Sequence, residues 1–162
     1  MARKINYQEV TLANQTAVNE LIIAAFNEDT LKHGQGPAGG PPGYDNGQLL
    51  AKLQVEEGLL ESVYYQEQLI GCYCVQPLLG REKAELRLLC VAVTHQNQGF
   101  GQQIWQELEE RLPYKRWLVE TPAYSIDNQR FYEESCGFHT VAIRDYQGSQ
   151  GIVFEKQIEG KD

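Results

Sequence analysis

The sequence has no long apolar run, and this absence sets the first limits on the protein. None of its 162 residues falls in a stretch approaching the roughly 20 apolar residues that a membrane-spanning helix needs. The N-terminal segment carries some positive charge, but no apolar stretch follows it, so it does not resemble a signal peptide. We therefore expect a cytoplasmic protein that does not associate with membranes.

Positive charge is also scarce. The chain has 14 Lys and Arg residues against 22 Asp and Glu residues, which gives a net charge of −8. Nucleic-acid-binding domains usually carry a basic stripe, so the sequence predicts no nucleic-acid partner. A negative field favours a cationic partner such as an amine, although acidic surfaces also serve solubility alone.

Cysteine is sparse and lacks the spacing of a metal site. The four residues Cys72, Cys74, Cys90 and Cys136 form no paired motif of the kind that binds zinc, so we expect no metal. Cys72 and Cys74 stand two residues apart and share one face of a strand, where they cannot readily bond to each other. The sequence therefore predicts buried free thiols.

Periodic apolar residues predict a mixed fold, and 33–43 is too rich in Gly and Pro for either helix or strand. The predicted strands are 4–12, 59–65, 69–79, 84–93, 116–120, 138–145 and 151–158. The predicted helices are one that begins after Asn14 or Thr16, then 46–57, 99–112 and 126–135. The 84–93 strand is almost continuously apolar at its end and should be buried on both faces. This order predicts one α/β (α+β) domain over residues 1–162.

The most informative segment runs from Glu85 to Gly101, where a buried strand leads through a loop into a helix. We call residues 96–101 of this segment the glycine loop. A helix N-terminus offers unpaired N–H groups and the positive end of the helix dipole, which together bind phosphate. The loop lacks the Gly-Lys-Ser/Thr of a Walker motif, and Ile104 stands where a dinucleotide-binding turn has its third glycine.

Two linked motifs resemble those of the GCN5-related N-acetyltransferase (GNAT) superfamily. Gln96-Asn-Gln-Gly-Phe-Gly101 matches its Q/R-x-x-G-x-G/A signature, and Asn128 to Phe138 is similar to its N-x-x-F-Y-x-x-x-G-F segment. The resemblance covers residues 84–138. It implies a mostly antiparallel sheet with a splayed central strand pair, flanked by helices. It also implies an N-acetyltransferase that moves an acetyl group from acetyl-CoA to a primary amine by direct attack in a ternary complex.

The resemblance also implies roles for individual residues. The glycine loop would bind the cofactor, with the backbone N–H groups from Gln98 to Gln102 holding the pyrophosphate. The strand edge would pair with the pantetheine arm, Asn128 would contact that arm, and Tyr132 would be the general acid for the departing thiolate. The implied cofactor-binding set is Cys90, Val91, Val93, Gln96, Asn97, Gln98, Gly99, Phe100, Gly101, Gln102 and Asn128.

The base that takes the ammonium proton stays open between Glu85, Glu120 and a water chain. His95, in the segment before the glycine loop, is expected to shape that loop rather than to act as a base. The sequence departs from the family pattern at two places. Position 98, which is often basic in the family, is Gln here. Asn128 matches only the shorter form of its motif, because Ser125 stands where the asparagine more commonly lies.

The acceptor is the least defined part of the prediction. The resemblance places a long loop, 28–47, near the acceptor, and its Glu28, Asp29, Tyr44 and Asp45 suit a cationic amine on a small molecule or a peptide. Two other functions remain: a non-catalytic module that binds CoA thioesters, and a longer-chain acyltransferase. A homodimer through the hairpin at 138–158 also remains open.

Overall fold

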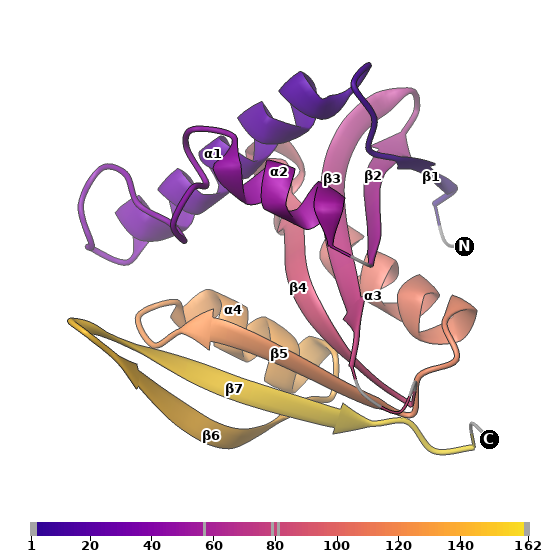
Figure 1. Cartoon of the computed structure of the whole chain (residues 1–162), viewed down its shortest axis with the longest axis vertical. Helices are drawn as coiled ribbons and strands as arrows, with labels where there is room; N and C mark the ends of the chain where they lie inside the picture. The colour runs from indigo at the N-terminus through magenta and orange to yellow at the C-terminus, as the bar shows by residue number, and fades with distance from the viewer. Residues whose placement is uncertain (1–2, 57, 79, 81, 161–162) are drawn as a thin grey trace.

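The computed structural model describes residues 3–56, 58–78, 80 and 82–160, and within them a seven-stranded sheet carries helices on both faces (Figure 1). The strands are β1 (Ile5–Glu9), β2 (Leu59–Tyr65), β3 (Gln68–Pro77), β4 (Lys83–Val91), β5 (Arg116–Pro122), β6 (His139–Tyr146) and β7 (Ser149–Gln157). The helical segments are α1 (Gln15–Lys32), α2 (Gln48–Val55), the 3₁₀ turn η1 (Val93–His95), α3 (Phe100–Arg111), α4 (Ile126–Arg130) and the π-helical turn η2 (Phe131–Ser135). The predicted fold class is confirmed.

The sheet consists of two antiparallel parts that meet at one parallel pair. Its strand order is β1-β2-β3-β4-β5-β7-β6, and neighbours are antiparallel except for β4 and β5. The β4–β5 pairing runs only from Lys83↔Arg116 to Glu85↔Leu118. Beyond Glu85 the two strands diverge, which gives the predicted splayed pair (Figure 1).

A β-bulge lets β4 supply both hydrophobic cores. Cys74 pairs with Leu88 while Val75 pairs with Leu86, so Arg87 is an extra residue on β4. The extra residue reverses the alternation of side chains, and Leu86 and Leu88 therefore face opposite sides of the sheet. This bulge explains why β4 is packed on both faces, as its sequence predicted.

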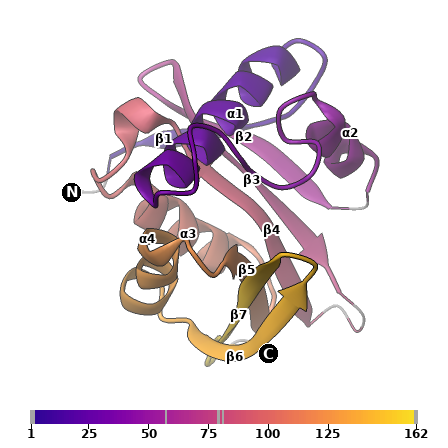
Figure 2. The same ribbon diagram turned by 90° about the vertical axis from the view of Figure 1, so that its left-hand side faces the viewer.

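The two cores lie on opposite faces of the sheet (Figure 2). The first core packs α3 and η2 against the sheet, and within it the indole rings of Trp105 (α3) and Trp117 (β5) meet edge to face with centroids 4.9 Å apart. The second packs α1 and α2 against β2, β3 and the end of β4. No helix in the described ranges has the length and apolar character that a membrane crossing requires.

Several predicted boundaries are wrong. Helix α1 continues to Lys32, so Glu28 and Asp29 lie on a helix and not in a loop. Asn14 stands at the N-cap of α1, but its side chain accepts from the Thr11 N–H instead of capping the helix. The predicted ends at residues 57 and 79 lie outside the described residues.

Two more corrections concern the site. The strand ends at Val91, and Val93 starts the turn η1 with 40% of its surface exposed. The helix predicted over 126–135 changes after Arg130 into the π-helical turn η2, which contains Tyr132. Gly137 follows with φ +82°, the left-handed conformation expected at its helix end.

Candidate active site

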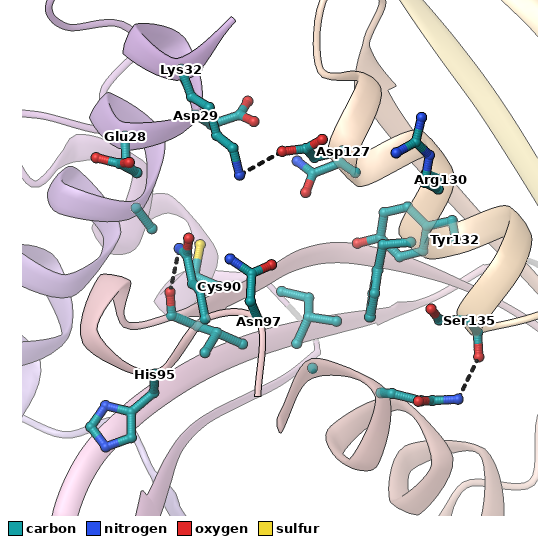
Figure 3. Close-up of a pocket in the computed structure, with 18 of the residues that line it drawn as sticks. Glu28, Asp29, Lys32, Cys90, His95, Asn97, Asp127, Arg130, Tyr132 and Ser135 are labelled. Carbon is teal, nitrogen blue, oxygen red and sulfur yellow. Dashed lines mark hydrogen bonds and ion pairs between the residues drawn. The ribbon is translucent and has the colours of Figure 1, made fainter. Parts of the chain in front are cut away.

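A cavity of about 680 Å³ lies beside the end of β4, between α1 and the segment formed by α4 and η2 (Figure 3). Its walls come from four segments: α1, the end of β4, the glycine loop with the first turn of α3, and α4 with η2. The cavity has two chemically different ends. One is the glycine end, formed by the glycine loop and the start of α3. The other is the acidic end, where Glu28, Asp29 and Asp127 lie together with Lys32 (Figure 3).

The wall between the two ends is the edge of β4. Leu89, Cys90 and Val91 line the cavity, beyond the last residue pair that β4 forms with β5. The Gln96 side chain donates to the Val91 carbonyl at 3.0 Å and ties the glycine loop to this edge. An extended chain placed here would find an unpaired strand edge, which is the requirement for β-augmentation.

At the glycine end, two glycines serve two different needs. Gly99 is the N-cap of α3 and has φ +85°, a left-handed conformation that strains any other residue. Gly101 needs room rather than a special conformation, because a Cβ atom there would lie 3.2 Å from the Phe131 ring. Among the described residues, no side chain caps the N-terminus of α3, so its first N–H groups remain available to an anion.

The predicted loop residues divide into those that line the cavity and those that support it. Gln96, Asn97, Gly99, Gly101 and Gln102 line it, as does the neighbouring His95. The side chains of Gln98, Phe100 and Val93 do not contribute to the lining.

The supporting residues hold the glycine loop in place from behind. Phe100 is only 2% exposed and packs between the rings of Tyr65 and His95. Gln98 donates to the Thr94 carbonyl at 3.2 Å, which closes the loop on itself.

Tyr132 lies opposite the β4 edge and directs its hydroxyl into the cavity (Figure 3). Its ring is 6% exposed and packs against Phe131, Phe138 and Phe154. Burial raises the pKa of Tyr132 above its ordinary value, so the phenol stays protonated at neutral pH. Asn128, one turn earlier, also lines the cavity.

The acidic end joins α1 to α4 across the opening. Lys32 forms an ion pair with Asp127 at 2.6 Å (Figure 3), and the hydrogen bond from Lys32 is the main cause that lowers the pKa of Asp127. Ser125 donates to Asp29 at 2.9 Å, and His33 lies 3.2 Å from Asp29. The sequence analysis missed Lys32 and Asp127, because nothing in a linear sequence indicates that these two segments meet.

Neither predicted base lines the cavity. Glu85 pairs with Arg87 at 3.1 Å at the far end of β4. Glu120 pairs with Arg144 at 2.9 Å and accepts from the Tyr146 hydroxyl at 2.5 Å. Their role as a base therefore stays a prediction.

The predicted loop residues Tyr44 and Asp45 also lie away from the cavity lining. Tyr44 is buried against Phe26, and its hydroxyl donates to Asn27 at 2.7 Å. The four cysteines are free and buried, as predicted, and of these only Cys90 is among the lining residues.

Comparison with known proteins supports the same reading of the motifs. The profile of the Acetyltransferase (GNAT) family matches residues 23–138, which include the glycine loop, the β4 edge and Tyr132. A search of curated proteins finds no significant match.

Solved structures share the fold at low sequence identity. A GNAT family acetyltransferase from Elizabethkingia anophelis, solved with acetyl-CoA bound, has a TM-score of 0.70 at 20% identity and covers 95% of this chain and 98% of its own. PaiA N-acetyltransferase from Thermoplasma acidophilum, in complex with coenzyme A, has a TM-score of 0.71 at 15% identity, with 96% and 99% covered. The ribosomal-protein-S18-alanine N-acetyltransferase of Escherichia coli has a TM-score of 0.68 at 19% identity, with 96% and 94% covered.

Proposed function

The chain belongs to the GNAT family of acetyltransferases, and from this premise we propose that it transfers an acetyl group from acetyl-CoA to a primary amine. GNAT enzymes use acetyl-CoA as a co-substrate, and two of the structural neighbours were crystallised with acetyl-CoA or CoA. The whole chain, 1–162, acts in this proposal as one catalytic domain.

One observation carries the proposal: the β4 edge, the uncapped start of α3 and the Tyr132 hydroxyl face the same cavity. The glycine end supplies N–H groups for the pyrophosphate, and the β4 edge at Cys90 and Val91 supplies a partner for the pantetheine arm. Asn128 contacts that arm. In this proposal the thioester lies between β4 and Tyr132.

The proposed reaction is a direct attack of the amine nitrogen on the thioester carbonyl. A C–N bond forms, the C–S bond breaks, and its electron pair leaves with the CoA sulfur. The attacking nitrogen gives up one N–H proton to water, and the released thiolate takes a proton from water. A free thiol has a pKa of about 8.5, well below that of the buried Tyr132 phenol. Tyr132 therefore assists mainly by donating a hydrogen bond to the departing thiolate.

The ammonium proton must leave before the attack, and in this proposal it leaves through water. Glu85 and Glu120 are both engaged in ion pairs outside the cavity lining, so either could receive the proton only along a water chain. No covalent acyl-enzyme is needed, because the amine and the thioester meet in one ternary complex.

The acidic end supports a cationic acceptor. Lys32 also lines this end and pairs with Asp127, so the attraction for an ammonium group comes mainly from Glu28 and Asp29. The acceptor is an amine of a small molecule or of a peptide. The E. coli neighbour acts on an alanine of a ribosomal protein, but its low identity transfers only the fold to this chain.

The first experiment measures binding of acetyl-CoA by calorimetry and thermal shift, with ATP and NAD as controls. A ligand at about 100 times its Kd should stabilise the fold by roughly 2.7 kcal/mol. We expect a shift with acetyl-CoA and none with the controls, followed by amine-dependent release of free CoA thiol in a panel of amines. A protein that ignores acetyl-CoA, or that responds equally to ATP, would refute the proposal.

The same assay separates acetyl transfer from its alternatives. Propionyl-CoA and succinyl-CoA serve as rival donors, and a clear preference for either would indicate a longer-chain acyltransferase. Tight binding of acetyl-CoA without release by any amine in a broad panel would indicate a binding module.

A further inference from the structure

Arg3, just before β1, contacts both the glycine loop and the first turn of α3. The Arg3 guanidinium stacks on the Phe100 ring, 3.7 Å from its centroid, and its Nη2 donates to the Gln98 carbonyl at 2.7 Å. Arg3 is not among the residues that line the cavity, whereas Gly99 is. Arg3 therefore supports the loop from behind.

The backbone of Arg3 is held as firmly as its side chain. The Arg3 carbonyl accepts from the Gln103 side chain on the first turn of α3. Gln103 also donates to Glu107 at 2.9 Å, and Glu107 accepts from the Tyr7 hydroxyl at 2.9 Å. This chain of bonds fixes the start of β1 on α3 and so fixes where the guanidinium lies.

The bond to Gln98 has a consequence for the next N–H group. The peptide between Gln98 and Gly99 is planar and trans, so its C=O and N–H point in opposite directions. Because Arg3 holds the carbonyl, the Gly99 N–H points away from Arg3, and Gly99 itself lines the cavity. Without that bond, the left-handed glycine leaves this peptide free to rotate.

The position of the charge also indicates an anion. The segment from Gln96 to Gln102 carries no charged side chain of its own. Arg3 places a cation beside the start of α3, where the helix dipole is already positive, and a cation there is unfavourable on its own. A phosphate bound at the start of α3 would be attracted by both the dipole and the guanidinium.

We propose that Arg3 is a positioning residue for acetyl-CoA: it orients the Gly99 N–H and adds positive charge behind the glycine loop, so that the pyrophosphate binds. This role rests on the proposed function, because it needs CoA as the ligand. Arg3 touches neither the reacting atoms nor the acceptor. Its loss should weaken cofactor binding and leave the unfolding free energy nearly unchanged.

The test compares CoA binding by the wild type, Arg3→Met, Arg3→Lys and Arg116→Gln, with any affinity tag at the C-terminus. Arg3→Met keeps an apolar contact with Phe100 but removes the charge and the hydrogen bond. Arg3→Lys keeps the charge but loses the planar fork. Arg116→Gln, at a half-exposed site that does not line the cavity, makes the same change in net charge.

We expect Arg3→Met to raise the Kd for CoA about tenfold, as for loss of a hydrogen bond to a charged group. The difference in Kd between Arg3→Met and the wild type should shrink at high salt, because salt screens the attraction between Arg3 and the phosphates in the wild type. The Kd of Arg3→Lys should lie between those of the wild type and Arg3→Met, and the Kd of Arg116→Gln should match that of the wild type. In NMR spectra, CoA should shift the Gly99 amide strongly in the wild type and much less in Arg3→Met.

Other results would overturn the inference in distinguishable ways. Unchanged CoA affinity in Arg3→Met would remove any role for Arg3. Equal losses in Arg3→Met and Arg116→Gln would reduce the effect to net charge, and full affinity in Arg3→Lys would refute the orientation of the Gly99 peptide. If a lower unfolding free energy of Arg3→Met accounts for its whole loss of CoA affinity, Arg3 has only a structural role. Failure of the wild type itself to bind CoA would refute the proposed function instead.

Discussion

The two ends of the cavity bind by different means. The glycine end offers backbone N–H groups. Its shape depends on two glycines, one with a left-handed backbone conformation and one with no room for a Cβ atom. The acidic end offers side chains from α1 and α4, held by contacts such as Lys32–Asp127. A backbone site depends on one short segment and so leaves a motif in the sequence. A side-chain site assembled from distant segments leaves none, which is why the cofactor could be predicted and the acceptor could not.

The largest effect should come from the residue between the two ends. We expect Tyr132→Phe to lower kcat by about 100-fold or more, the usual effect of removing a hydrogen-bond donor to a developing negative charge, with an unchanged Kd for acetyl-CoA. Stopped-flow release of CoA thiol and calorimetry would measure the two quantities. If acetyl-CoA binding collapsed in parallel with turnover, Tyr132 would be part of the packing and not of the chemistry.

The glycine end can be blocked without straining the backbone. In Gly101→Val the added side chain meets the Phe131 ring, already 3.2 Å from a Cβ atom, and fills the approach to the start of α3. We expect the Kd for acetyl-CoA to rise about 30-fold or more, or roughly 2 kcal/mol. Far-ultraviolet circular dichroism should show an intact fold. Wild-type affinity in this variant would place the phosphates elsewhere.

A change at the acidic end should affect the amine acceptor and leave acetyl-CoA binding unchanged. Asp127→Asn removes a carboxylate that faces the cavity and breaks the ion pair with Lys32. We expect the KM for a cationic amine to rise about tenfold, as for a lost bond between charged groups, and the Kd for acetyl-CoA to stay within about twofold. Asp45→Asn, on an exposed turn outside the cavity lining, is the matched control. A defect in acetyl-CoA binding would mean that the two ends do not act separately.

The smallest effect concerns the cores beneath the two ends. Burial raises the pKa of Cys74 from 9.0 to about 11 and that of Cys136 to about 12. Between pH 9 and 11 the unfolded chain therefore holds fewer protons on these thiols than the folded one, and stability falls as the pH rises. Urea unfolding across this range should show the decline, and a Cys74→Ala/Cys136→Ala variant should show a shallower one. Equal slopes would mean that other groups cause it.

The sequence predicted the fold well where local patterns decide it. Alternation located the strands, and the glycine motif located the start of α3 within one residue. The loop was wrongly predicted to begin at residue 28, because residues 28–32 are polar except for Leu31 and lie beside a Gly- and Pro-rich segment. Their helical state depends partly on contacts with α4, such as Lys32–Asp127, that no local pattern encodes.

The candidate site shows the same division. Gly99, Gly101 and Asn128 line the cavity as their motifs indicated, whereas Glu85 and Glu120 do not. Glu85 is a candidate base only through the resemblance, whereas its ion pair with Arg87 and the bulge at Arg87 decide where its carboxylate lies. The π-helical turn that carries Tyr132 likewise has no sequence signal that we recognised.

The packing of Trp105 against Trp117 gives the molecule a built-in optical reporter. These are the only two tryptophans in the chain, and the contact between their rings joins α3 to β5. Neither indole N–H has a hydrogen-bond partner in the described part of the chain, so both chromophores sit in an apolar setting that favours short-wavelength emission. Any relative movement of the two parts, on ligand capture or on heating, would change the spectrum without a label.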